Sequence, residues 1–160
     1  MIRFVLLGIV VVYIQYFSAD NISIIDLTPN ILLPFIIYLS IFKKANAALI
    51  FSFIFGIILD LNNPPSFGIT TFNFVIIAFI LINIKSMINK GQILAYFSVI
   101  LMTNFVFFLS SNLIIYIFQI NQTFPITKIL ILSLYNTVIS IIIILILFNF
   151  NKLKISFKDF

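Results

Sequence analysis

Long apolar runs separated by short polar segments fill the chain. The first run extends from Phe4 to Phe17, between Arg3 and the polar Ser18. An apolar run of about 20 residues crosses the hydrocarbon layer of a bilayer as an α-helix. The pattern contains six such runs, at residues 3–19, 29–42, 45–61, 68–84, 92–118 and 129–148. We therefore expect an all-α fold: a polytopic membrane bundle of six transmembrane helices, forming a single domain over residues 1–160.

The first two runs leave open questions. The run after Arg3 is also compatible with a signal peptide, which would leave five spans, but Phe17 does not fit the small-residue cleavage pattern. The second run is short and covers only about 21 Å as a helix. Thr28 and Pro29 predict its start, with Thr28 as N-cap and Pro29 as the first helical residue. Pro34 predicts a bend within it.

Composition agrees with this layout and limits the chemistry. The chain is 63% hydrophobic and 8% charged, whereas a soluble domain carries about 25% charged residues. It has no Cys, His or Glu, which excludes zinc, haem and iron–sulfur sites and any Cys or His nucleophile–base pair. We expect no cofactor, no metal and no catalytic residue. The four carboxylates are Asp20, Asp26, Asp60 and Asp159.

The basic residues predict the orientation of the spans. Lys and Arg gather on the cytoplasmic side of membrane proteins. With the N-terminus inside, eight of the nine basic residues are cytoplasmic, and Lys128 alone is outside. The eight are Arg3, Lys43, Lys44, Lys85, Lys90, Lys152, Lys154 and Lys158. We expect both termini in the cytoplasm, and we attribute the net charge of +5 to topology rather than to nucleic-acid binding.

Asp60 is the carboxylate within a predicted span. It lies at the outer end of the third span, just before the turn at residues 62–66. Its simplest role is to cap backbone N–H groups of that turn or of the helix that starts near Gly68. A proton or cation site is the alternative that an ionisable residue in a span raises. Contact with a partner protein is the third.

A row of small residues precedes Asp60 on the same helix. Ala48, Ser52, Gly56 and Asp60 recur at every fourth position. Such rows let two helix backbones approach closely in lipid. The partner helix lies either in the protein's own bundle or in another membrane protein.

Polar residues also form stripes on the last three predicted helices. The sixth span carries one at intervals of three and four residues, which is one helix face. We expect the stripes to face one another and to exchange interhelical hydrogen bonds; a cavity for a neutral substrate is the alternative. The residues are Ser133, Asn136, Thr137 and Ser140 on the sixth span, Asn104, Ser111 and Asn112 on the fifth, and Thr70 and Asn73 on the fourth.

Residues 28–79 resemble the MreD family of rod shape-determining membrane proteins. The resemblance rests on Pro29-Asn30 before an apolar helix, then Gly56 and Asp60 four residues apart, a short turn, and Gly68 eight residues after the aspartate. Length and six-span layout are similar to the family as well. Many members have Gly where this chain has Ser52, which keeps the position small.

This resemblance implies a scaffold rather than an enzyme. Family members lie in the bacterial inner membrane and bind the bitopic protein MreC, and together they connect MreB filaments to the side-wall peptidoglycan synthesis machinery. The resemblance implies an MreC-like partner and other cell-elongation and wall-synthesis membrane proteins nearby. The composition implies the lipid bilayer, and self-association of the chain is left open. The runner-up is the substrate-binding component of an energy-coupling-factor vitamin transporter. Its first helix usually carries Ala-x-x-x-Ala, which the first run here lacks.

Overall fold

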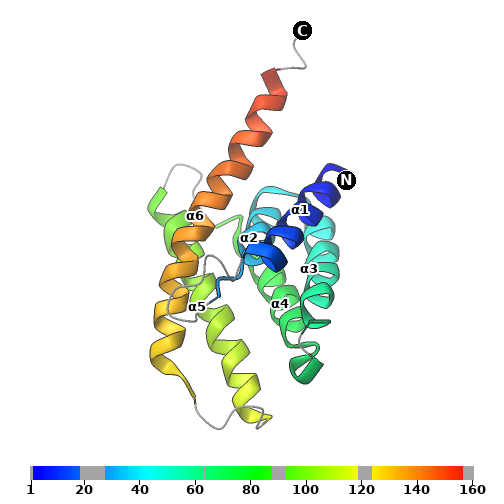
Figure 1. Ribbon diagram of the computed structural model, residues 1–160. Helices are drawn as coiled ribbons and strands as arrows, with labels where there is room; N and C mark the ends of the chain where they lie inside the picture. Colours follow the sequence, from blue (N-terminus) through cyan, green and yellow to red (C-terminus); the bar gives the residue numbers. More distant parts are fainter. Residues whose placement is uncertain (1, 19–27, 63, 88–92, 119–123, 157–160) are drawn as a thin grey trace.

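Six α-helices make up the described part of the chain in the computed structural model, which covers residues 2–18, 28–62, 64–87, 93–118 and 124–156. They are α1 (Ile2–Ser18), α2 (Leu32–Phe42), α3 (Ala45–Asp60), α4 (Ile69–Ile84), α5 (Ile93–Ile117) and α6 (Ile126–Ser156). A 3-10 turn, Pro64–Ser66, lies between α3 and α4, and these residues include no strand. Successive helices run in alternating directions (Figure 1). The predicted all-α class is confirmed.

The central element of the bundle is α2. This helix packs against each of the other five, whereas α3 packs mainly on α4 and α5 mainly on α6. Every residue from Leu32 to Ser40 is buried. A helix that is apolar on all sides is expected to lie inside a bundle. Its 11 residues extend only about 16 Å, and its neighbours enclose that length.

The start of α2 differs from the sequence prediction. Thr28 and Pro29 lie before the helix, so Thr28 is not its N-cap and Pro29 is not its first residue. Asn30 provides the cap instead, because its Oδ1 accepts a hydrogen bond from the N–H of Leu33 at 3.0 Å. Pro34 lies in the first helical turn, where a backbone N–H has no partner within the helix. Its ring therefore interrupts no hydrogen bond, and the reason for the predicted bend is absent.

Two helices are long and apolar enough to cross a membrane among the residues described, at Leu94–Ile117 and Ile126–Asn149. The other four are shorter apolar helices. Helix α6 begins three residues earlier than predicted and continues through Lys152 and Lys154, where the sequence predicted a tail. Its last turns extend beyond the other helices (Figure 1). The remaining boundaries lie within one residue of the predictions.

Lysines gather where α2 meets α3 and where α4 ends, which is one end of the bundle (Figure 1). The Lys85 ammonium donates to the Lys43 carbonyl at 3.3 Å, and Lys44 is exposed. Burial lowers the pKa of Lys43, and its Nζ lies 5.6 Å from the centre of the Tyr38 ring. Lys128 lies in the first turn of α6, at the opposite end. Asp20, Asp26, Lys90, Lys158 and Asp159 lie outside the described residues.

Candidate functional site

The carboxylate of Asp60, the last residue of α3, caps the start of α4. Its Oδ1 accepts the backbone N–H of Thr70 at 3.0 Å. Its Oδ2 accepts the N–H and the hydroxyl of Thr71, at 2.9 and 2.6 Å. The first N–H groups of a helix lack partners within it, and a negative charge there is stabilised by the helix dipole. The side chain is 1% exposed, so this geometry favours the capping role over a proton or cation site.

Gly68 makes this cap possible. It occupies the N-cap position of α4 with a φ of 91°, in the left-handed region that glycine adopts without steric cost. No atom lies within 4 Å of where a Cβ would be. The requirement at this position is therefore conformational rather than one of space.

The small residues of α3 face α4 at close range. Ala48, Ser52, Gly56 and Asp60 are all buried. A Cβ atom on Gly56 would lie 2.4 Å from the Cα of Thr71, so the two backbones touch there. The Ser52 hydroxyl donates to the Ala48 carbonyl of its own helix at 2.7 Å. This row packs within the protein's own bundle, which was the simpler of its two possible roles.

Side chains from α1 and α6 hold the extended segment before α2. The Gln15 amide donates through Nε2 to the Pro29 carbonyl at 3.2 Å, and its Oε1 accepts the N–H of Ile31 at 2.6 Å. The N–H of Asn30 donates to Oδ1 of Asn136 at 2.8 Å. A backbone that is not helical needs such partners when it is removed from water. The Pro29-Asn30 pair is thus the point where α1, α2 and α6 are joined.

The polar stripes of α5 and α6 meet in the core. Asn136 donates through Nδ2 to Oδ1 of Asn104 at 2.6 Å, and Asn104 donates to the Ser140 hydroxyl at 3.2 Å. All three residues are fully buried. Hydrogen bonding therefore satisfies polar groups that would be costly to bury alone.

A second polar contact joins α4 to α5. Asn73 donates through Nδ2 to the Ser111 hydroxyl at 2.8 Å, and the Ser110 hydroxyl donates to Oδ1 of Asn73 at 2.8 Å. The sequence predicted one meeting of three stripes, whereas the structure has two separate networks. Ser133 and Thr137 are buried but donate to carbonyls of their own helix.

The sequence did not predict the roles of Gln15, Tyr16 and Ser110. The hydroxyl of Tyr16 donates to the Ile58 carbonyl of α3. The signal for Gln15 was present: it is the one amide side chain in an otherwise apolar run. Its partners are backbone atoms of another segment, which no pattern within the run identifies.

The end of the bundle that carries these residues contains a cavity of about 470 Å³. Gln15, Asn30, Thr70 and Ser111 contribute polar atoms to its wall, and Phe107 contributes an apolar surface. None of the described residues that line it is charged, and their polar groups offer neutral hydrogen bonds. The described residues also contain no group of His, Cys, Asp and Glu able to hold a metal ion.

These features define a bundle of apolar helices in which buried polar side chains and small residues join helix to helix, as in membrane proteins. The chain belongs to the MreD family, described as rod shape-determining protein MreD, whose match covers residues 1–154. This agrees with the resemblance drawn from Pro29, Asn30, Gly56, Asp60 and Gly68. No curated protein and no solved structure matches the chain significantly. The family assigns the chain a structural role in determining rod shape, as a membrane protein.

Proposed function

We propose that the chain spans the bacterial inner membrane six times, with both termini in the cytoplasm. Helices α1, α3 and α4 have 17, 16 and 16 residues, which corresponds to about 24 Å each. Helices this short fit a bilayer that thins locally around them. The short α2 is enclosed by its neighbours. The lysine-rich end then faces the cytoplasm, in keeping with the distribution of basic residues.

We further propose that it acts as a scaffold in the cell-elongation machinery and binds an MreC-like bitopic partner by helix packing. The observation that carries this proposal is the use of Asp60. The one carboxylate in the described part of the chain is committed to three hydrogen bonds that fasten α3 to α4. A carboxylate that makes these three bonds stabilises the packing of α3 on α4. We infer that the lipid-facing surfaces of the helices are where a partner binds. Family membership supports the same role.

Deleting the gene from its rod-shaped host and pulling down the tagged protein test this proposal together. We expect rounded or widened cells, rescue by the wild-type gene, and co-purification of an MreC-like protein from detergent-solubilised membranes. Normal shape combined with a vitamin-uptake defect would instead favour the transporter component. Altered shape without any MreC-like partner would retain the family role and reject the adaptor mechanism.

A further inference from the structure

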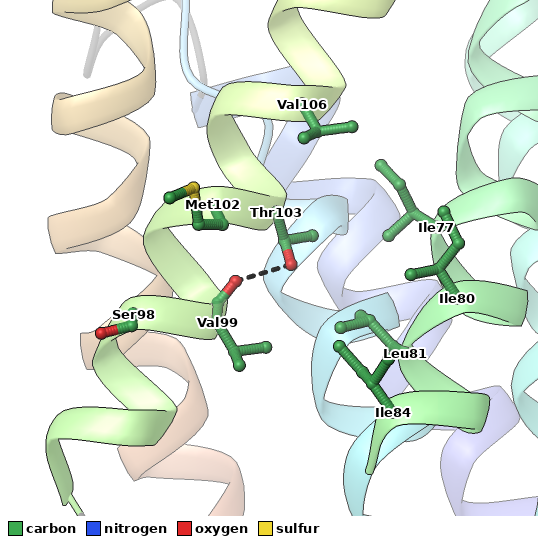
Figure 2. A pocket seen from close by; sticks show the side chains of 9 residues that line it. All are labelled: Ile77, Ile80, Leu81, Ile84, Ser98, Val99, Met102, Thr103 and Val106. Atoms are coloured by element: carbon green, nitrogen blue, oxygen red, sulfur yellow. Dashed lines mark hydrogen bonds between the residues drawn. The ribbon is translucent and has the colours of Figure 1, made fainter. Parts of the chain in front are cut away.

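An apolar groove runs between α4 and α5, on the half of the bundle nearer the lysine-rich end. Its volume is about 320 Å³. Ile77, Leu81 and Ile84 of α4 form one wall, and Val99, Thr103 and Val106 of α5 form the other. Figure 2 shows these side chains pointing into the space between the two helices.

Helices α4 and α5 are joined by hydrogen bonds at their other halves. Asn73 holds Ser110 and Ser111 there, beyond the groove as seen along both helices. Within the groove, the Thr103 hydroxyl donates to the Val99 carbonyl of its own helix at 2.7 Å (Figure 2). An occupant therefore meets hydrocarbon walls, and its own surface must be apolar.

Positive charge lies at the end of this groove. Lys85 directly follows Ile84 and lies one turn beyond Leu81. An ammonium has three donors, and the hydrogen bond to the Lys43 carbonyl uses one of them. The exposed Lys44 directly follows Lys43 in the chain and is the N-cap residue of α3. The one aspartate of the described residues, Asp60, caps the far end of α4, so no carboxylate in this part of the chain opposes an anion here.

We propose that the groove holds an acyl chain of an anionic phospholipid from the cytoplasmic leaflet, with the phosphate at Lys85 and Lys44. This inference rests on the proposed orientation of the six spans. From Ile77 to Ile84 the groove extends about 10 Å, most of the roughly 15 Å thickness of one leaflet. Basic pockets between helices on the cytoplasmic side recognise anionic headgroups.

The size of the groove favours an acyl chain over a helix of a partner. A helix is about 10 Å across, and α4 and α5 on the two sides of the groove already pack against each other. An acyl chain is thin and flexible, so it suits the apolar space that Leu81 and Val99 line. A groove open to hydrocarbon is also filled by lipid unless a protein covers it.

The absence of tryptophan from the chain permits a direct test by fluorescence quenching. Met102→Trp places one fluorophore at the groove, where Met102 is 62% exposed. Ile142→Trp is the matched control on α6: it is 53% exposed and lies at a comparable depth, because Asn104 and Ser140 are hydrogen bonded. Each full-length variant is reconstituted in phosphatidylcholine vesicles containing a minor fraction of phosphatidylglycerol, with one lipid or the other brominated.

We expect the Met102→Trp variant to be quenched preferentially by brominated phosphatidylglycerol, and the Ile142→Trp variant by both lipids equally. Adding Lys85→Gln should reduce the preference for phosphatidylglycerol about fivefold, because one lysine near a membrane surface contributes about 1 kcal/mol to the binding of anionic lipid. Adding Lys128→Gln, at the opposite end, should leave it unchanged. If the two brominated lipids quench the Met102→Trp variant equally, the lipid site is overturned. It is also overturned if the preference for phosphatidylglycerol persists after Lys85→Gln.

Measuring how much MreC-like partner each variant binds distinguishes failure of the lipid site from failure of the scaffold role. The Lys85→Gln variant should still capture the MreC-like partner at the wild-type level, so loss of lipid preference and loss of the scaffold function are distinguishable. Protection of the Met102→Trp fluorophore from both brominated lipids when that partner is bound would assign the groove to a helix of the partner. That outcome also overturns the lipid site.

Discussion

Gly56 of α3 and Thr71 of α4 lie in backbone contact, with no room for a side chain between them. A Cβ atom on Gly56 would lie 2.4 Å from the Thr71 Cα. One turn further along α3, Asp60 accepts two hydrogen bonds from the same threonine. The close approach and the helix cap thus depend on each other, because the carboxylate reaches α4 at a distance that the glycine sets.

Gly56→Ala should lower the free energy of unfolding by about 1–3 kcal/mol, the usual cost of overpacking a tight contact. Gly56→Leu should greatly reduce the amount of folded protein in the membrane. The added atoms meet backbone, which cannot rotate away. Thermal unfolding of the purified protein measures the effect. Ile54→Ala, on the same helix at a side chain that is 43% exposed, is the control. A Gly56→Ala protein as stable as that control would contradict the close approach.

Asp60→Ala should cost up to about 2 kcal/mol, as the loss of an N-cap does, and Asp60→Asn should cost less. Asparagine keeps one acceptor oxygen of similar position, and the cell-shape function should largely persist. Thr71→Val, which removes only the hydroxyl donor of the 2.6 Å bond, should lie near Asp60→Asn. Unfolding measurements and rescue of cell shape check both properties. A stable but inactive Asp60→Asn protein would revive the ion-handling role.

The sequence predicted the helices and the Asp60 cap, but only part of the hydrogen bonding. Apolar runs determine where helices form, and Asp60 and Gly68 are close enough in the chain for their relation to be inferred. Gln15 bonds to backbone atoms before α2, a relation that depends on how α1 and α2 pack. Neighbouring helix positions such as Ser110 and Ser111 differ by about 100°, so a stripe alone does not predict that Asn73 binds both.

Asn136→Ala should destabilise the bundle more than Asn112→Ala. The first removes bonds to Asn104 and to the Asn30 N–H, whereas Asn112 bonds, among the described residues, only to the Phe108 carbonyl of its own helix. One interhelical bond in a membrane protein contributes about 0.6 kcal/mol on average, and a stranded N–H adds about 1–3 kcal/mol. A double-mutant cycle between Asn104 and Asn136 should give a coupling of about 0.5–2 kcal/mol. Equal effects of the two alanine variants would show that the α5–α6 network does not stabilise the bundle.

The absence of cysteine from the chain allows the proposed orientation to be measured directly. Asn62→Cys lies at an exposed position near the Asp60 end, and Ser86→Cys at an exposed position after α4. In intact spheroplasts, a membrane-impermeant maleimide should label the Asn62→Cys protein and not the Ser86→Cys protein, and both should react after lysis. Labelling of the Ser86→Cys protein alone would reverse the topology, and with it the leaflet of the proposed lipid site.

Gln15→Met should destabilise the protein by about 1–3 kcal/mol, because a side chain of similar length loses both of its hydrogen bonds and leaves the Ile31 N–H without a partner. Gln15→Glu keeps the acceptor for Ile31 but opposes the Pro29 carbonyl with a second acceptor, so it should also be less stable than wild type. Tyr13→Phe, at a 61% exposed position of the same helix, should be neutral within about 0.5 kcal/mol. Thermal unfolding measures the stability of the three variants.

Because the Gln15 amide joins α1 to the segment that Asn136 holds from α6, the effects of Gln15→Met and Asn136→Ala on stability should be non-additive. Strict additivity would show that α1 and α6 hold the Pro29-Asn30 segment independently.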